Sequence, residues 1–239
     1  MKNKLGILKI IIITLISLVL YGFSNSEYKQ RKLHDTQVMI YPIDQPFIDH
    51  SSVNNLLIQN SDDMSNLLID ALNLVKLEQR LKNHQMVDNA SVFVTVDGVL
   101  SAKVYQRQPV ARLITDTAFV YIDQKGQLMP TSENFSARVP LAYGFKASDI
   151  ENSHPVFNKI YNDDFYKKLI TQISLKNDSS IVLATRLDNF AVHLGKPDNL
   201  TRKLANFKAF YQYLKKKNQL KRYETIDLRF GKQVIASKN

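Results

Sequence analysis

Residues 90–107, "ASVFVTVDGVLSAKVYQR", decide the fold of the first half of this chain. Apolar and polar side chains alternate on both sides of Asp97-Gly98, a dipeptide that is typical of tight hairpin turns. A two-residue turn would pair Val96 with Val99, so the stretch predicts two antiparallel strands in that register. In this register both faces of the hairpin are mixed. The side chains that we expect to face the core are Leu100, Ala102 and Val104.

Three elements are expected before this hairpin. The segment "QVMIYPI" (37–43) is a short apolar strand that ends at Pro42, because proline lacks the N–H group that a sheet ladder needs. Ser51 or Ser52 can cap a first helix. Asn73 can cap a second helix, in which apolar side chains recur every three or four residues. The first half therefore has the order β-α-α-β-β.

After Pro109 the pattern changes to short strands that are separated by turn residues. Strands are expected over 112–116, 118–123 and 126–130, with the turn "DQKG" between the last two. A helix is expected over about 163–175, because its aromatic and aliphatic side chains recur at helical spacing.

The last third of the chain combines a hairpin, a helix and a terminal strand. "SIVLATR" (180–186) and "FAVHLG" (190–195) bracket a turn at 187–189. Pro197 opens a helix whose apolar side chains form a stripe with steps of four and three residues. "YETIDLRFGKQVIA" (223–236) alternates apolar and polar side chains, which predicts one continuous closing strand.

The expected fold class is α+β, with an N-terminal transmembrane helix, a small β-α-α-β-β domain and a mixed, mainly antiparallel β domain with packed helices. The expected division is a cytoplasmic tail (1–4), a transmembrane anchor (5–23), a linker (24–36), the small domain (37–108) and the β domain (109–239).

The segment before the first strand is strongly apolar. Residues 10–23 carry no charge, and as a helix they would span about 21 Å of a hydrocarbon core that is about 30 Å thick. Including residues 5–9 gives about 28 Å, with the Lys9 ammonium extended to the boundary. We therefore expect an uncleaved single-pass anchor with a cytoplasmic N-terminus. The side chains that would contact lipid are Ile10, Ile11, Ile12, Ile13, Leu15, Ile16, Leu18, Val19 and Leu20.

A cleaved signal peptide is the alternative, because Lys2 and Lys4 precede an apolar stretch of suitable length. Gly22 and Ser24, or Ser24 and Ser26, can supply the small residues of a cleavage site, although no A-x-A motif is present. Both interpretations place residues 25–239 outside the cytoplasm.

Composition excludes several classes of site. The chain has 239 residues, a formal net charge of +10 and no cysteine, which excludes disulfides and thiolate metal sites. Residues 201–239 are strongly basic, but the run at 215–222 ends an expected helix, where cations complement the helix dipole. No aromatic side chain interrupts this run to stack on a base, so we expect no nucleic-acid partner.

No catalytic, cofactor-binding or metal-binding site is predicted, and we expect no enzyme. The aspartate pairs at 62–63 and 163–164 precede expected helices and suit capping. The sequence has no nucleophile motif and no glycine-rich phosphate loop. The histidines lack metal-ligand spacing. They are His34, His50, His84, His154 and His193.

Three local features together resemble the FtsQ/DivIB family of bacterial cell-division proteins. "DGVLSAKVYQRQPVAR" (97–112) ends a unit that resembles a POTRA (polypeptide-transport-associated) domain of the FtsQ type. "VYIDQKGQLMP" (120–130) is similar to the hairpin that follows that domain, and "YETIDLRFGKQVI" (223–235) is similar to the family's terminal strand. The order and spacing of these features along the chain carry the resemblance.

The resemblance implies a non-enzymatic scaffold of the inner membrane at the division septum, with its bulk in the periplasm. Such a protein recruits FtsB/FtsL-type bitopic partners and through them controls septal peptidoglycan synthesis. An anchored or secreted envelope enzyme with an unrecognised active site is the alternative.

The resemblance also implies that partners bind at the closing strand, where an extended segment can pair with an open sheet edge. By resemblance the best candidates are Arg229 and Phe230, and Lys232 and Gln233 extend the same edge. Alternation places Arg229 outward, where it can pair with a partner carboxylate. The same alternation places Phe230 on the apolar face with Leu228, so a core position and a contact position both stay open.

Overall fold

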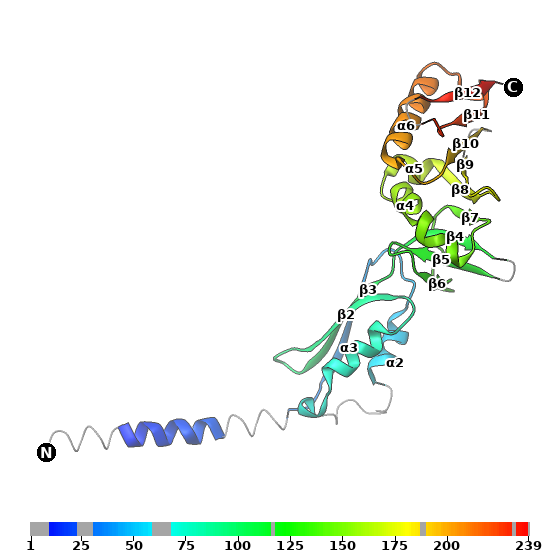
Figure 1. Cartoon of the computed structure of the whole chain (residues 1–239). Helices are drawn as coiled ribbons and strands as arrows, with labels where there is room; N and C mark the ends of the chain where they lie inside the picture. The colour runs from blue at the N-terminus through cyan, green and yellow to red at the C-terminus, as the bar shows by residue number, and fades with distance from the viewer. Residues whose placement is uncertain are drawn as a thin grey trace. The chain divides into compact units, whose positions relative to one another are not determined.

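The computed structural model describes residues 10–22, 31–58, 68–115, 118–186, 190–230 and 233–238. The chain forms two compact units, Met1–Gln106 and Arg107–Asn239. Both units combine helices and strands (Figure 1), so the expected α+β class is confirmed.

Residues 10–22 form a helix in which all nine predicted lipid-contacting side chains are exposed. Thr14 and Ser17 donate their hydroxyl groups to carbonyl oxygens four residues earlier, at 2.9 Å each. Within the described ranges, no helix combines the length and the apolar character that a membrane span requires. Residues 5–9 and 23 of the expected anchor lie outside the described residues.

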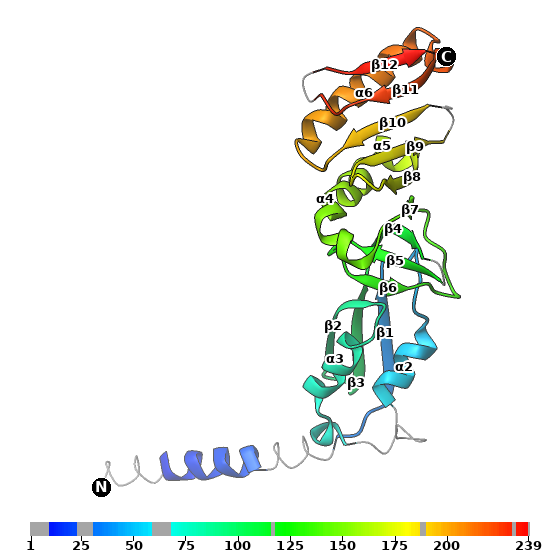
Figure 2. The same ribbon diagram turned by 45° about the vertical axis from the view of Figure 1, so that its right-hand side comes forward.

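Unit 1 is a three-stranded sheet with two helices on one face (Figure 2). The strand order is β1-β3-β2, with β1 parallel to β3 and β2 antiparallel to β3. This is the β-α-α-β-β order that the sequence predicts. The elements are β1 (Asp35–Tyr41), α2 (His50–Ile58), the 3-10 turn η2 (Ile69–Ala71), α3 (Leu74–Lys82), β2 (Val87–Val94) and β3 (Val99–Gln106).

The hairpin between β2 and β3 has a three-residue loop, so the predicted pairing of Val96 with Val99 is wrong by one position. The Thr95 N–H donates to the Val99 carbonyl oxygen (2.9 Å), and the Val99 N–H donates to the Thr95 hydroxyl (3.0 Å). Gly98 has a φ of +86°, a left-handed conformation that glycine adopts without a steric penalty. The Thr95 hydroxyl and Gly98 therefore favour the longer loop.

The corrected register resolves the mixed faces. Val92 pairs with Ala102 and Val94 pairs with Leu100, so the valines of β2 share a face with the apolar side chains of β3. Because a shift of one residue moves a whole strand to the other face, the two-residue turn would have split this core. The predicted core residues Leu100, Ala102 and Val104 are buried, as expected.

Helix capping agrees with the sequence at one helix and differs at the other. At α3 the Asn73 side chain accepts a hydrogen bond from the Lys76 N–H (3.0 Å), as predicted. At α2 the cap is Asp49, whose carboxylate accepts the Ser52 N–H (2.7 Å), so Ser51 and Ser52 do not cap this helix. A carboxylate has the additional advantage of its charge at the N-terminal end of the helix dipole.

The side chain of Gln106 fixes the loop that follows β1. Its Oε1 atom accepts the N–H groups of Phe47 (2.6 Å) and Ile48 (3.0 Å), and its Nε2 atom donates to the carbonyl oxygens of Pro42 and Gln45. Four hydrogen bonds satisfy this buried amide. The glutamine at the end of the hairpin therefore has a structural role within unit 1.

Unit 2 is a nine-stranded sheet in the order β12-β11-β10-β9-β8-β7-β4-β5-β6. Helices α4, α5 and α6 cover one face of the sheet, and no described helix covers the other face (Figures 1 and 2). The strands are β4 (Pro109–Ile114), β5 (Phe119–Asp123), β6 (Leu128–Pro130), β7 (Leu141–Tyr143), β8 (Ile170–Leu175), β9 (Ile181–Thr185), β10 (Ala191–Gly195), β11 (Tyr223–Asp227) and β12 (Ile235–Lys238). The helices and 3-10 turns are η3 (Ala147–Asp149), α4 (Ile150–Tyr161), α5 (Asp164–Leu169), α6 (Leu200–Lys216) and η4 (Leu220–Arg222).

Several expectations for unit 2 are confirmed. The turn "DQKG" joins β5 to β6, and the Asp123 carboxylate accepts the N–H groups of Lys125 and Gln127. β9 and β10 form an antiparallel pair, although the predicted turn at 187–189 lies outside the described residues. The apolar stripe of α6 is buried at Leu204, Phe207, Tyr211 and Leu214.

The prediction of a helix over 163–175 is wrong in its second half. The helix α5 ends at Leu169, and residues 170–175 continue directly as β8, which pairs with β7 and β9. β-Branched side chains such as those of Ile170, Thr171 and Ile173 suit a central strand. The helix α4, which the sequence analysis did not predict, packs its apolar side chains against the same core.

Candidate partner-binding surface

The closing segment is a hairpin, so the prediction of one strand over 223–236 is wrong. β11 ends at Asp227, a turn follows at Leu228–Phe230, and the chain returns as β12. β11 is parallel to β10 on one side and antiparallel to β12 on the other. Both of its edges are therefore occupied by the protein's own backbone, and the open edge belongs to β12.

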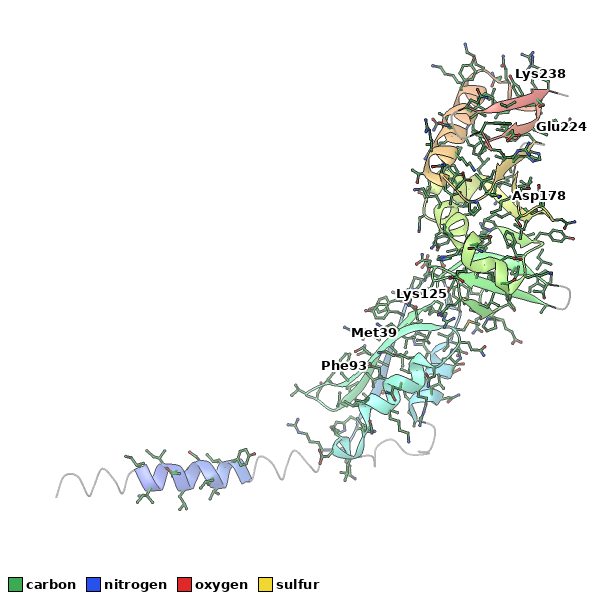
Figure 3. The ribbon with its side chains drawn as sticks, in the orientation of Figure 1. Met39, Phe93, Lys125, Asp178, Glu224 and Lys238 are labelled. Carbon is green, nitrogen blue, oxygen red and sulfur yellow. The ribbon has the colours of Figure 1, made fainter. Side chains whose placement is uncertain are left out.

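The strand β12 ends the sheet, and no described strand pairs with its outer side. No described side chain forms a hydrogen bond with the backbone of Ile235–Lys238. Lys238, which is labelled in Figure 3, marks the end of this strand. Ile235 is 40% exposed, so the edge also presents an apolar side chain.

The Asp227 carboxylate stabilises the turn between β11 and β12. Asp227 accepts the Arg229 N–H (2.9 Å), the backbone geometry of an Asx turn. The same carboxylate accepts the Arg229 Nε atom at 3.0 Å and the Nη2 atom at 2.6 Å. The turn and the orientation of the guanidinium group are therefore fixed together.

Gly195 at the end of β10 makes room for the Arg229 side chain. A Cβ atom on Gly195 would lie 2.7 Å from Arg229 Cγ, closer than van der Waals contact allows. Gly195 also has a φ of +75°, which disfavours any other residue. The glycine that ends "FAVHLG" is the sequence signal for this contact. The sequence alone does not show that Arg229 is its neighbour, because the contact forms only when β10 and the turn lie side by side.

The charges around Arg229 are balanced by two carboxylates. The hydrogen bond from Arg229 lowers the pKa of Asp227, and nearby His193 lowers it further. Hydrogen bonds from Ser180 lower the pKa of Asp178, with a smaller contribution from Arg229. In return, Asp227 raises the pKa of Arg229. Asp178, Asp227 and Arg229 are thus charged at neutral pH, which suits the binding of a charged partner.

A hollow of about 970 Å³ lies on the helix-free face beside this turn. Arg229 and His193 line it together with residues from β7, β8, β9 and the loop that contains Asp178. Asp178 is labelled in Figure 3. Tyr143 in its lining is 58% exposed. Sequence analysis did not find this hollow, because its lining comes from segments that are far apart in the chain.

The predicted partner-binding residues fall on the turn and the segment after it. Arg229 is exposed, and Phe230 is 54% exposed, so the core interpretation of Phe230 is wrong. Phe230 leaves the buried face of Leu228 because the regular alternation stops at the turn. Gln233 is exposed, and Lys232 lies outside the described residues.

Comparisons with known proteins agree with this architecture. Residues 108–237, more than half of the 239-residue chain, match the family model described as FtsQ/DivIB, C-terminal related. Residues 37–105 match a POTRA-like domain. The first match includes the terminal hairpin up to Ser237, and the second includes β1 from Gln37, all of β2, and β3 up to Tyr105.

One similar relative is the cell division protein FtsQ of Salinibacter ruber (strain DSM 13855 / M31). The two sequences are 27% identical over an alignment of 172 positions, and this alignment covers 65% of this chain and 66% of the relative. The match thus spans just under two thirds of that relative's length. The resemblance that the sequence suggested is confirmed, and the chain belongs to the FtsQ/DivIB C-terminal-related family, with a POTRA-like domain before the family's β domain.

Proposed function

We propose that this chain is a non-enzymatic scaffold of cell division that captures bitopic partners of the FtsB/FtsL type at its C-terminal hairpin. Membership of the FtsQ/DivIB family supports a cell-division role. The observation that carries the proposal is the open edge of β12 beside an exposed arginine and an exposed phenylalanine. Through these partners the protein would control septal peptidoglycan synthesis.

Backbone pairing at β12 supplies part of the binding energy. In an antiparallel pair both polar groups of a residue face the same side, and successive residues alternate. Two of the four residues of β12 therefore offer about four groups to a partner strand. At about 1 kcal/mol net per hydrogen bond, this gives roughly 4 kcal/mol before the cost of association. Contacts of side chains must supply the remaining binding free energy.

Arg229 and Phe230 are suited to that addition. Asp227 engages the Nε and Nη2 atoms of Arg229, and no described residue accepts a hydrogen bond from its Nη1 atom. The outer side of the guanidinium group can therefore bind a partner carboxylate without losing its internal ion pair. Phe230 offers an exposed aromatic ring, the kind of side chain that is often important at interfaces. Gln233 and the predicted contact Lys232 would extend this surface.

The proposal also includes an anchor in the inner membrane, with residues 25–239 on the periplasmic side. The helix at 10–22 supports it, because its apolar side chains are exposed all round and would be stable in lipid. A fluorescent fusion should then gather at midcell, and the intact chain should fractionate with the inner membrane. A diffuse, soluble signal would contradict this part of the proposal.

A pull-down of the full chain with the FtsB-type protein of the same genome tests the docking surface. Phe230→Ala and Arg229→Glu should each reduce capture at least fivefold. The thermal unfolding midpoint should stay unchanged in Phe230→Ala, because this ring is exposed, and should fall slightly in Arg229→Glu, because this variant loses the ion pair with Asp227. The matched controls are Phe119→Ala, whose ring is 57% exposed in the same unit, and Arg202→Glu on the exposed side of α6. Normal capture by both test variants would refute the docking proposal.

A further inference from the structure

A second hollow of unit 2 is strongly basic. It has a volume of about 850 Å³ and lies where β7 and β8 begin and β9 ends, whereas the hollow beside Arg229 is lined by the opposite ends of β7 and β8. We call it the basic groove. Its floor includes Val139, Pro140 and Ile170. The charged side chains that line it are Arg138, Lys167, Lys168, Arg186 and Asp164.

The cations of the basic groove lack internal carboxylate partners. Arg138 and Lys168 have no side-chain hydrogen bond or ion pair with any described residue. Arg186 donates its Nε atom to the Lys168 carbonyl oxygen (3.2 Å), and the Lys167 ammonium lies 4.0 Å from the centre of the Tyr161 ring. Elsewhere in the unit, by contrast, Lys203, Lys208 and Arg229 each pair with an aspartate. Four cations therefore face one exposed carboxylate, Asp164.

The cations are also ordered in space. Arg138 precedes β7, Lys167 and Lys168 precede β8, and Arg186 follows β9. Because β7, β8 and β9 are neighbours in the sheet, this row crosses three adjacent strands, a span of about 10 Å. An extended peptide places every second side chain on one face at intervals of about 7 Å, so two or three carboxylates on one face would reach across the row.

We propose that the basic groove binds an extended, acidic segment of a partner protein. Arginines at both ends of the row can bind carboxylates in bidentate fashion, and the apolar floor accepts an aliphatic side chain between them. This site lies apart from the β12 edge, so the inference goes beyond the proposed function and does not depend on it.

Other anionic occupants fit the groove less well. No exposed aromatic side chain lines it to stack on a nucleic-acid base, because the lining contains no aromatic residue. A flat membrane surface would leave a concave groove partly empty, and the lining offers no large exposed apolar side chain for insertion. A single inorganic phosphate would reach only part of a row that spans three strands.

The test uses the full chain in detergent and a fluorescein-labelled peptide with the repeat Glu-Val-Glu-Val-Glu, measured by fluorescence anisotropy at low salt. The triple variant Arg138→Glu/Lys168→Glu/Arg186→Glu should raise the Kd at least tenfold. The matched control is Arg202→Glu/Lys221→Glu/Arg222→Glu, which changes the same residue types and net charge at exposed positions outside the groove and should stay within twofold. Circular dichroism checks that both variants are folded.

Two further arms define the ligand. The matching Gln-Val peptide should bind at least tenfold more weakly, and the double variant Arg138→Lys/Arg186→Lys should weaken binding severalfold, because lysine cannot bind bidentately. Equal loss in the two triple variants would overturn the proposal, since it would reveal a general charge effect. Absence of peptide binding, or tighter binding of an oligonucleotide or of phosphatidylglycerol vesicles through the same three residues, would overturn it as well.

Discussion

Two edge strands, β2 of unit 1 and β12 of unit 2, are arranged in opposite ways. In unit 1 the Glu78 side chain of α3 lies against the edge strand β2, where its Oε2 atom accepts the Val92 N–H (3.3 Å). Its Oε1 atom binds Lys82 (2.7 Å), which holds the carboxylate in place. In unit 2 no described side chain forms a hydrogen bond with the backbone of β12. The edge of β2 is therefore covered by a side chain, and the edge of β12 is open to pairing with another strand.

This difference agrees with the docking surface that we propose at β12. Unpaired edges are a risk for aggregation, and proteins usually protect them with charges or with a covering side chain. Such a side chain covers β2, and no described side chain covers β12 in the same way. A protected edge and an open edge also give paired positions at which the comparison can be tested.

The largest effect is expected from proline in β12. Successive N–H groups of a strand point to opposite sides, and proline has no N–H group. Of the variants Ala236→Pro and Ser237→Pro, one therefore removes a donor on the open side of β12, and the other removes a donor on the side of β11. The outward variant should lower partner capture at least thirtyfold, about 2 kcal/mol, with unchanged thermal stability. The inward variant should lose both capture and stability. Normal capture by both variants would show that β12 does not pair with the partner.

The second effect concerns the scaffold under Arg229. Gly195→Ala forces an unfavourable φ and a contact with Arg229 Cγ, so we expect a loss of about 1.5 kcal/mol in the free energy of unfolding and weaker partner capture. Gly126→Ala is the control, since Gly126 has a similar φ of +77° but its Cβ atom would meet only the His154 side chain. This control should lose some stability and keep full capture. Urea unfolding and the pull-down measure both quantities, and equal capture by the two variants would contradict the role of Gly195.

The sequence predicted the elements better than their exact pairing. Alternation and the Asp97-Gly98 signal identify β2 and β3, but they do not distinguish a two-residue turn from the observed three-residue loop. The deciding contact is the hydrogen bond between the Thr95 hydroxyl and the Val99 N–H, which is local but has no strong sequence signature. At α5 and β8, pairing with two neighbouring strands overrides a helical pattern.

The shape of the segment that carries the candidate residues was not predicted from the sequence. The resemblance pointed to Arg229 and Phe230, but the strand pattern hid the turn between them and β12. The alternating pattern predicts Asp227 as an outward residue of a continuous strand. In the structure its carboxylate accepts the Arg229 N–H, and the strand ends there. The hollow and Gly195 depend on contacts between β10 and the turn, and a single sequence does not reveal such long-range contacts.

A third prediction opens the protected edge. Glu78→Ala removes the acceptor of the Val92 N–H, whereas Glu78→Gln keeps an amide oxygen at that position. The alanine variant should show a slightly lower melting temperature and concentration-dependent self-association in light scattering. The glutamine variant should stay monodisperse in the same concentration series. Identical behaviour of the two variants would mean that the carboxylate does not protect β2.

The smallest effect is the pH dependence of the same contact. The hydrogen bond from Lys82 lowers the pKa of Glu78 from its ordinary value of 4.5, and the Val92 N–H lowers it further. A carboxylate whose pKa is lower in the folded state stabilises that state fully above the unfolded pKa, and this contribution disappears as the pH falls through the folded pKa. The amide-exchange protection factor of Val92 should therefore be constant above about pH 4.5 and decrease below it. In Glu78→Gln, which does not titrate, the same amide should show no such step, and a step of equal size in both proteins would assign it to another group.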